Sequence, residues 1–171
     1  VRRQGIGKAL VSAAIDAAGS DCDYVSVSFG LTDELWKFWH GCGFRLVRVG
    51  NQREASSGCY TAMAVLPLTD KASRFTVEAE QSLQRNLAFV EPHWLAELPP
   101  EICRPAEQDI QALSKADWQE LAGFAWGSRS FETSSPVLMR WRALLPSPPP
   151  LLAACDGAET QNQNVVAAGG R

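Results

Sequence analysis

The first 68 residues alternate between helical and strand patterns of hydrophobic positions. Apolar residues three or four apart predict a helix over residues 7–18 and a second helix that begins after Thr32, a suitable N-cap, and ends at Gly43. Alternating positions predict strands over residues 24–29, 44–49 and 59–66, the last two flanking a polar loop. We therefore expect an α/β (α+β) fold whose last two strands form an antiparallel hairpin. The expected core side chains of the second helix are Leu35, Phe38, Trp39 and Cys42.

The pattern becomes helical after Pro67. A helix of about twenty residues is expected after Thr69, with Ala72, Phe75, Ala79, Leu83, Leu87 and Val90 on its apolar side. Residues 92–105 contain four prolines and are expected to be a connector. A capping box at Ser114–Asp117 opens another helix, and a last helix is expected over residues 136–145. The expected core side chains of the helix after Ser114 are Trp118, Leu121, Ala122 and Ala125.

Prolines at residues 146–150 interrupt the pattern, and the sequence beyond them is rich in Gln, Asn, Ala and Gly. We expect residues 146–171 to be a disordered tail. The expected organisation is therefore an α/β domain over residues 1–68, a mainly helical region over residues 69–145, and this tail.

Composition narrows the classes of function. The net charge is −3, and residues 70–171 carry nine Lys and Arg against thirteen Asp and Glu, so the chain lacks an overall basic nucleic-acid footprint. Its five cysteines include no C-x-x-C pair, which favours reduced thiols over a metal or disulfide role. No secretory signal or membrane-length apolar run is present, and the expected location is cytoplasmic.

A candidate phosphate site stands at the start of the first helix, where Arg2–Lys8 contain the pattern R-x-x-G-x-G. Glycine lets the backbone approach a ligand closely, and the N–H groups at a helix start attract anions. The arginines and Lys8 add positive charge. The alternative interpretation is an ordinary loop before a helix.

This block resembles the second half of a GNAT acetyltransferase, in which R-x-x-G-x-G binds the pyrophosphate of acetyl-CoA. The following strand and the helix ending in Gly43-Phe44 match the next feature of that family. A more specific resemblance, covering nearly all of residues 1–68, is to the bacterial tRNA(Met) cytidine acetyltransferases. It is carried by the segments at residues 26–30, 34–39, 42–44 and 51–64, with weaker similarity at residues 118–125.

The resemblance implies a partial GNAT fold with a mixed sheet, followed by a helical tRNA-binding region. It implies acetyl transfer from acetyl-CoA to N4 of the wobble cytidine of elongator tRNA(Met). It also implies ATP with Mg in a preceding helicase-like region, of which this chain would be the C-terminal continuation. Neither DNA nor a membrane is an expected partner.

The implied acetyl-CoA contacts are Arg2, Arg3, Gln4, Gly5, Ile6, Gly7, Lys8 and Glu34. Glu34 has an alternative role as a first-turn acid that favours the helix dipole. Gly41 departs from the family, which usually has an arginine there. A neighbouring cation such as Lys37 is a candidate to replace that contact.

No catalytic residue can be assigned. Trp39 stands where many GNAT enzymes have a tyrosine acid, and an indole N–H is not a usable acid at neutral pH. His40 and His93 are interpreted as a surface residue and a connector residue. At the hairpin tip, Arg53, Ser56 and Ser57 are candidate substrate contacts, with a solvated loop as the alternative.

Two other functions remain open from the sequence. The first is a free-standing acetyltransferase for a protein or small-molecule amine. The second is a non-catalytic segment that binds coenzyme A or RNA without turnover. No metal site is expected.

Overall fold

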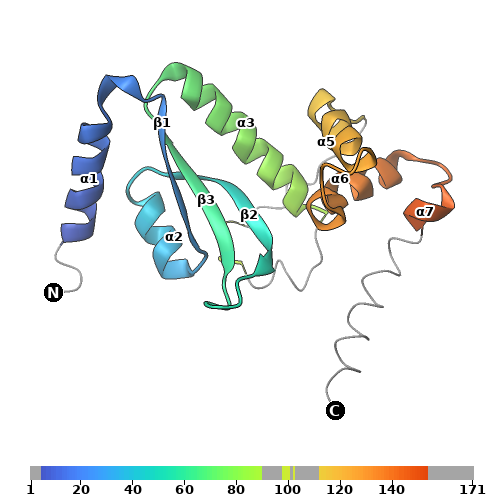
Figure 1. Cartoon of the computed structure of the whole chain (residues 1–171), viewed down its shortest axis with the longest axis horizontal. Helices are drawn as coiled ribbons and strands as arrows, with labels where there is room; N and C mark the ends of the chain where they lie inside the picture. Colours follow the sequence, from blue (N-terminus) through green and yellow to red (C-terminus); the bar gives the residue numbers. More distant parts are fainter. Residues whose placement is uncertain (1–4, 90–97, 101, 103–111, 154–171) are drawn as a thin grey trace, which may run out of the picture. The chain divides into compact units, whose positions relative to one another are not determined.

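The computed structural model describes residues 5–89, 98–100, 102 and 112–153. The chain forms two compact units, Val1–Ala106 and Glu107–Arg171, which we describe separately and call unit 1 and unit 2. Unit 1 carries the described strands, and the described part of unit 2 is helical (Figure 1). The expected domain limits at residues 68 and 145 remain predictions.

Three strands form the sheet of unit 1, in the order β1-β3-β2: β1 (Tyr24–Gly30), β2 (Arg45–Arg53) and β3 (Tyr60–Pro67). Both pairings are antiparallel, so the expected hairpin is confirmed. The mixture of helices and strands confirms the fold class. The parallel pairing that a mixed sheet requires is not found among the described strands.

The hairpin loop is shorter than the sequence predicts. Strand β2 continues to Arg53, although polar residues begin at Gly50. The backbone explains the extension, since the N–H of Glu54 still donates to the carbonyl of Cys59 at 2.9 Å. At this end of the hairpin, backbone hydrogen bonds between the two strands, rather than apolar side chains, hold the pairing of β2 with β3.

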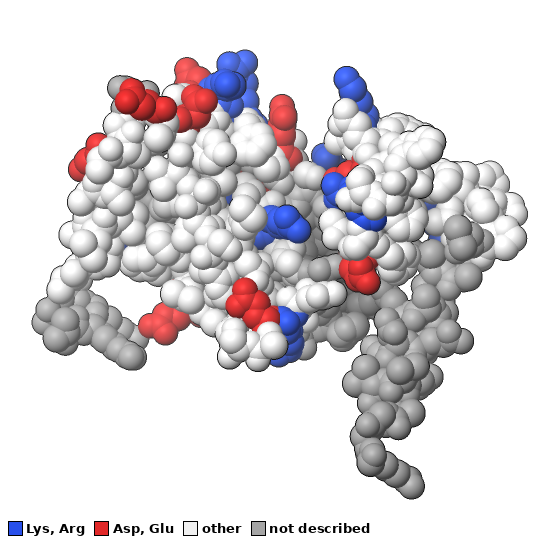
Figure 2. All heavy atoms as spheres, in the orientation of Figure 1, with Lys and Arg blue, Asp and Glu red and all other residues white. Residues whose placement is uncertain are grey.

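Helix α1 (Ile6–Ala18) leads through the 3₁₀ turn η1 (Gly19–Asp21) into β1. The apolar stripe expected on this helix makes few packing contacts. None of the residues of α1 is buried, and Leu10 is 67% exposed. On the face of unit 1 that Figure 2 shows, most of the surface carries no charged side chains.

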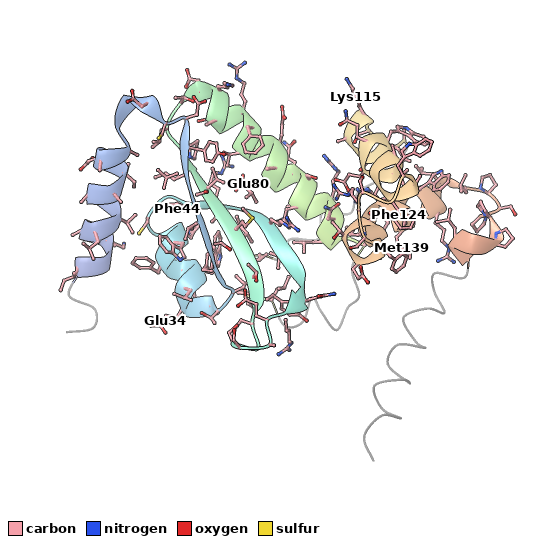
Figure 3. The ribbon with its side chains drawn as sticks, in the orientation of Figure 1. Glu34, Phe44, Glu80, Lys115, Phe124 and Met139 are labelled. Atoms are coloured by element: carbon pink, nitrogen blue, oxygen red, sulfur yellow. The ribbon has the colours of Figure 1, made fainter. Side chains whose placement is uncertain are left out.

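Helix α2 (Asp33–His40) has both of its predicted ends. The hydroxyl of Thr32 accepts from the N–H of Leu35 at 3.2 Å. Gly43 has φ of 91°, and the N–H of Phe44 returns to the carbonyl of Trp39 at 3.1 Å, as in a Schellman motif. Phe44 is 2% exposed and lies beside α2 (Figure 3).

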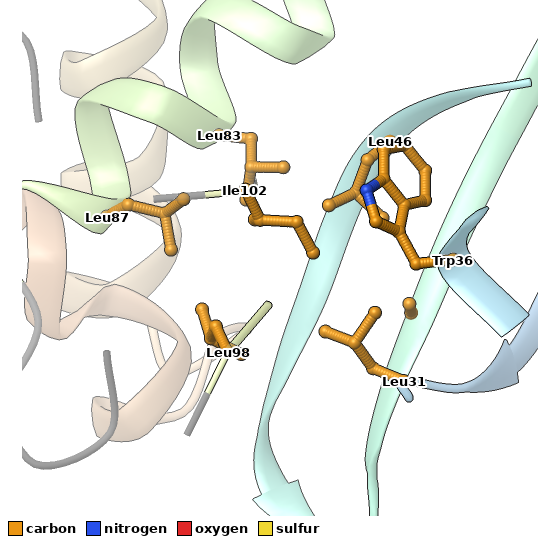
Figure 4. Close-up of a cluster of buried hydrophobic side chains, with 8 residues drawn as sticks. Leu31, Trp36, Leu46, Leu83, Leu87, Leu98 and Ile102 are labelled. Carbon is orange, nitrogen blue, oxygen red and sulfur yellow. The ribbon is translucent and has the colours of Figure 1, made fainter. Parts of the chain in front are cut away.

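The expected core face of α2 is partly wrong. Trp36 is the buried residue of this helix, whereas Leu35 is 40% exposed. The two positions differ by one residue, or about 100° around the helix. The helix is therefore rotated so that Trp36 reaches Leu31 and Leu46 (Figure 4).

Helix α3 (Asp70–Leu87) begins at the predicted cap Thr69, whose hydroxyl accepts from Ala72 at 3.2 Å. Leu83 and Leu87 complete the core of unit 1 (Figure 4). Phe75, expected in the core, is 52% exposed and its ring contacts Tyr24 with centroids 6.3 Å apart. Val90 lies outside the described residues.

The proline-rich connector contributes to the same core. Leu98 and Ile102 are 5% and 3% exposed and belong to the cluster of Leu83 and Leu87. The sequence pattern predicted no burial there, because the connector has no helical or strand period. The rest of this segment lies outside the described residues.

Unit 2 contains α5 (Lys115–Ala125), α6 (Phe131–Leu144) and the short α7 (Pro150–Ala153). The Ser114–Asp117 capping box is confirmed. Helix α6 begins five residues before the expected Pro136, because Ser130 caps it and Pro136 lies inside it. A proline there removes one helical hydrogen bond and leaves the others.

The core of unit 2 consists of Leu121, Val137, Leu138 and Leu152. Trp118, expected in the core, is 55% exposed, and Ala122 and Ala125 are exposed as well. Helix α7 and buried Leu152 fall within the segment that the proline run predicted to be disordered. Residues 154–171 lie outside the described part of the chain.

Candidate functional site

The glycine-rich segment forms an uncapped helix start. Gly5 is the N-cap of α1 with φ of 77°, and no side chain among the described residues caps the helix. The first helical hydrogen bond runs from the N–H of Ala9 to the carbonyl of Gly5, at 3.1 Å. In an α-helix the preceding N–H groups, here those of Ile6, Gly7 and Lys8, have no intrahelical acceptor. Such a helix start is suited to an anion.

The first turn of α1 lies against α2. A Cβ atom on Gly7 would be 3.1 Å from Cε2 of Phe38, so a larger residue would displace the ring. A Cβ atom on Gly41 would be 3.6 Å from Nζ of Lys8. The fold therefore brings Gly7 and Lys8 beside the second half of α2. Arg2, Arg3 and Gln4, expected in the same site, lie outside the described residues.

Glu34 is exposed in the first turn of α2, where Figure 3 labels it. It precedes Phe38 by four residues, and residues at this spacing share a side of a helix. It therefore faces the same general side as the ring that meets Gly7. Both interpretations of Glu34, as a ligand contact and as a favourable first-turn charge, remain predictions.

Lys37 has a different setting from Lys8. Its Nζ atom donates to Oδ2 of Asp33 at 2.8 Å, in an exposed pair along α2. Lys8, by contrast, places its Nζ next to Gly41. This geometry makes Lys8 the nearer candidate for the cation that Gly41 lacks, a possibility that the sequence spacing did not reveal.

Side chains organise the hairpin tip. Nη1 of Arg53 donates to the carbonyl of Gly58 at 3.1 Å, and its Cζ atom lies 5.4 Å from the ring centroid of Tyr60. The hydroxyl of Ser57 lies 3.3 Å from both Oε2 of Glu54 and the N–H of Cys59. Arg53 and Ser57 therefore shape the tip, and Ser56 beside them is exposed.

The hairpin also contacts the segment that leads into α2. The N–H of Leu31 donates to the carbonyl of Tyr60 at 2.7 Å. A Cβ atom on Gly30 would lie 3.4 Å from Cβ of Cys59 and 4.0 Å from Oγ of Ser57. The hairpin is thus bonded to residues 30–31, which lie directly before α2, the helix that carries Glu34.

Trp39 lies in an aromatic cluster. Its ring centroid is 6.1 Å from that of Phe29, 5.0 Å from Phe38 and 5.2 Å from Phe44. Its Nε1 atom is buried and has no hydrogen-bond partner in the described part of the chain. This setting favours a packing role for Trp39.

Of the two histidines, the structure describes His40. His40 is exposed in the last turn of α2, with its ring centroid 5.1 Å from that of Trp36. His93 lies outside the described residues. Within residues 5–89, 98–100, 102 and 112–153, no three His, Cys, Asp or Glu side chains gather as metal ligands. The same ranges hold no helix with the length and hydropathy needed to span a bilayer.

Comparison with known families gives two matches. Residues 1–69 match the family described as GNAT acetyltransferase 2, and residues 72–169 match the family described as tRNA-binding domain. Relatives named tRNA(Met) cytidine acetyltransferase TmcA include those of Salmonella typhimurium, 48% identical over 139 residues, and Yersinia pestis, 46% identical over 140 residues. Each alignment covers 81% of this chain and 20% of the relative, so the chain spans about a fifth of their length.

Proposed function

We propose that this chain is part of an enzyme that acetylates tRNA, on the premise that it belongs to the tRNA-binding domain family. Its first 69 residues match the GNAT acetyltransferases. The reaction is acetyl transfer from acetyl-CoA to N4 of the wobble cytidine of elongator tRNA(Met). The names of the relatives support this substrate. Because tRNA is the acceptor, the proposed enzyme acts in the cytoplasm. The ATP requirement implied by the resemblance stays a prediction.

The uncapped start of α1 is the observation that carries the proposal. Gly5 adopts a left-handed conformation, and the N–H groups of the first turn follow it without a side-chain cap. The ring of Phe38 lies where a side chain at position 7 would need space, so Gly7 is required for this contact. Backbone donors and Lys8 are then available to the pyrophosphate of acetyl-CoA.

The proposed chemistry is direct attack in a ternary complex. The N4 amine of cytidine attacks the thioester carbonyl carbon, and a C–N bond forms as the C–S bond breaks. Coenzyme A leaves as its thiolate, and the proton lost by N4 passes to water. The thiolate of a thiol whose pKa is about 8.5 is a stable leaving group, so no dedicated acid is needed to protonate it. The packing of Trp39 against Phe38 and Phe44 agrees with that scheme.

Orientation supplies much of the rate in this scheme. Holding the amine against the thioester can lower the barrier by several kcal/mol. Arg53, Ser56 and Ser57 are the proposed contacts to the acceptor, because they are exposed at a hairpin tip attached just before α2. Detection of an acetylated Cys42 or Cys59 during turnover would contradict direct attack, since it would indicate an acyl-enzyme.

The proposal is tested with two glycines at opposite ends of α1. Gly5 and Gly19 have φ of 77° and 60°, and among the described residues a Cβ atom would meet nothing within 4 Å at either position. Gly19 has ψ of −161°, a region that only glycine enters readily, whereas Gly5 has ψ of −5°. Gly19→Ala therefore carries the larger backbone strain and is a severe control for strain in α1. Calorimetry on the protein expressed from its complete gene should show acetyl-CoA affinity at least about tenfold weaker for Gly5→Ala and unchanged for Gly19→Ala.

The acceptor is tested in the same preparations. Mass spectrometry of tRNA(Met) after incubation with acetyl-CoA and ATP should find N4-acetylcytidine with the unaltered protein and much less with Gly5→Ala. Equal acetyl-CoA affinity in all three proteins would contradict the cofactor site. Acetylation of a protein or small amine, with none of tRNA, would favour a free-standing acetyltransferase.

A further inference from the structure

The turn between α5 and α6, residues 126–130, carries the most exposed large hydrophobic side chain of the described residues. Trp126 is 88% exposed. Tryptophan is highly buried on average in folded proteins, so a nearly uncovered indole needs an explanation. The turn follows Phe124, which Figure 3 labels on α5.

The backbone under Trp126 is firmly held. The N–H of Trp126 donates to the carbonyl of Ala122 at 3.0 Å, and that of Gly127 donates to Phe124 at 3.0 Å. Gly127 has φ of 72°, which reverses the chain directly after the indole. The ring is therefore presented from a fixed helix end.

A second set of bonds closes the turn. The carbonyl of Gly123 accepts the N–H groups of Ser128 at 2.9 Å and Arg129 at 3.2 Å, and also the hydroxyl of Ser128 at 2.9 Å. Ser130 then caps α6 through the N–H of Thr133. A held turn loses little entropy when its side chains bind a partner.

Arg129 places a cation on the same turn. Its methylene groups lie over Gly123, where a Cβ atom would be 2.8 Å from Cδ. Its guanidinium lies 3.5 Å from Glu120, and the side chain is 35% exposed. Its Nε atom is buried, so an external acceptor would have to meet the Nη1 and Nη2 groups at the end of the side chain. These two groups carry four N–H donors, more than the contact with Glu120 uses.

We propose that residues 126–130 bind a single-stranded nucleotide of the tRNA, with Trp126 stacked on an unpaired base and Arg129 contacting the neighbouring phosphate. The inference rests on the proposed function, which makes tRNA the partner. An unpaired nucleotide offers both a flat aromatic face and an anionic linkage, and base stacking on aromatic side chains is the usual way to recognise it.

Another protein segment is the alternative occupant. An apolar protein surface would cover the indole equally well, but it would gain little from a cation three residues away. The pairing of an exposed indole with a partly exposed guanidinium on one turn therefore favours RNA. The two occupants differ in what they require at position 126, since stacking needs an aromatic ring whereas protein packing needs only apolar volume.

Equilibrium binding of a tRNA(Met) transcript to the protein from the complete gene tests the inference. Trp126→Ala should weaken binding about 5- to 100-fold, and Trp126→Phe should retain most of it. Trp126→Leu should bind as poorly as the alanine variant. Gln119→Ala, an exposed position on α5, is the matched control and should bind like the unaltered protein.

The contact of Arg129 with a phosphate is tested separately, through the salt dependence of tRNA binding. Arg129→Gln should reduce the slope of log affinity against log salt by about one, as expected for the loss of one phosphate contact. A Trp126→Ala protein that binds tRNA within twofold of the unaltered protein would overturn the inference. Full binding by Trp126→Leu would do the same and would favour a protein occupant.

These outcomes are distinguishable from failure of the proposed function. Acetyl-CoA affinity should be unchanged in Trp126→Ala, which shows that unit 1 is folded. An unchanged thermal unfolding transition of the helices should show the same for unit 2. If Trp126→Ala retains both acetyl-CoA and tRNA binding, the inference fails and the proposed function stands. If the unaltered protein does not bind tRNA, both fail.

Discussion

Two glycines of unit 1 matter at the residue scale because of what occupies the space beside them. At Gly7 that space holds the ring of Phe38, and at Gly41 it is approached by Nζ of Lys8. The missing side chains therefore let α1 lie close to α2 and let the ammonium group of Lys8 approach Gly41. We propose Lys8 as the cation of the phosphate site.

Lys8→Ala should weaken acetyl-CoA binding about fivefold, which corresponds to roughly 1 kcal/mol for an exposed charge contact. Lys37→Ala is the matched control, because Lys37 is paired with Asp33 at 2.8 Å. Isothermal titration calorimetry on both variants checks the difference. Equal losses, or a loss confined to Lys37→Ala, would contradict the assignment to Lys8.

Gly43→Ala should lower the free energy of unfolding by about 1–3 kcal/mol, because φ is 91° and the new Cβ would lie 3.2 Å from Cδ1 of Leu66. Gly58→Ala carries the left-handed cost without a contact, since its φ is 67° and nothing lies within 4 Å. Urea denaturation should therefore find Gly43→Ala the less stable variant. A larger loss for Gly58→Ala would contradict the close packing at Gly43.

A buried ion pair joins α5 to α6 at the element scale. Nη2 of Arg140 donates to Oδ1 of Asp117 at 2.6 Å, with side chains only 3% and 6% exposed. Oδ2 of the same carboxylate accepts from the N–H of Ser114 at 2.9 Å and from its hydroxyl at 2.7 Å. One aspartate therefore caps α5 and ties it to α6.

Asp117→Ala should destabilise unit 2 by about 3–5 kcal/mol, because it leaves Arg140 buried without its carboxylate. The double variant Asp117→Leu/Arg140→Met should recover much of that loss by replacing the charges with apolar volume. Thermal unfolding followed by circular dichroism checks both expectations. A single variant as stable as the unaltered protein would show that the pair contributes little.

The same pair predicts an acid sensitivity. Burial by itself raises the pKa of Asp117, but the bonds from Ser114 and Arg140 outweigh it and hold the pKa below the ordinary value of 3.8. A lowered pKa stabilises the fold above the unfolded value and stops doing so as pH falls through the folded value. Unfolding between pH 2 and pH 6 should therefore lose less stability in Asp117→Asn than in the unaltered protein.

Each unit has its own hydrophobic core at the scale of the whole molecule, and α1 contributes little to either. Its residues are all partly or fully exposed, with Ile6 at 50% and Leu10 at 67%. The central strand β3 differs, since Ala62 and Ala64 are fully buried. The helix proposed to bind the cofactor is therefore the one described helix of unit 1 without a buried residue.

Amide hydrogens of α1 should exchange with solvent much faster than those of β3 in this chain, because few packed contacts oppose local opening. Saturating acetyl-CoA should slow exchange in α1 and leave β3 unchanged, since a ligand stabilises the state it binds. Hydrogen exchange with mass spectrometry measures both effects. Equal protection of the helix and the strand would contradict this view of α1.

The local signals in the sequence predicted the elements well. Thr32, Thr69 and Ser114 cap the helices that they were expected to cap, and Gly43 ends α2 as expected. The errors concern the end of β2, the start of α6, the unexpected α7, and burial. Trp36 is buried where Leu35 was expected, and Leu98 and Ile102 enter the core from a connector without a period.

The sequence by itself determined the three strands, the caps of three helices and the glycine that ends α2, and it marked the glycine-rich helix start as a candidate anion site. Those features depend on hydrogen bonds and backbone angles within a few residues of each other. Only the tertiary structure decided which side of α2 is buried, that Phe38 packs on Gly7 and that Lys8 approaches Gly41. Those outcomes depend on contacts between segments far apart in the chain, which no local pattern encodes.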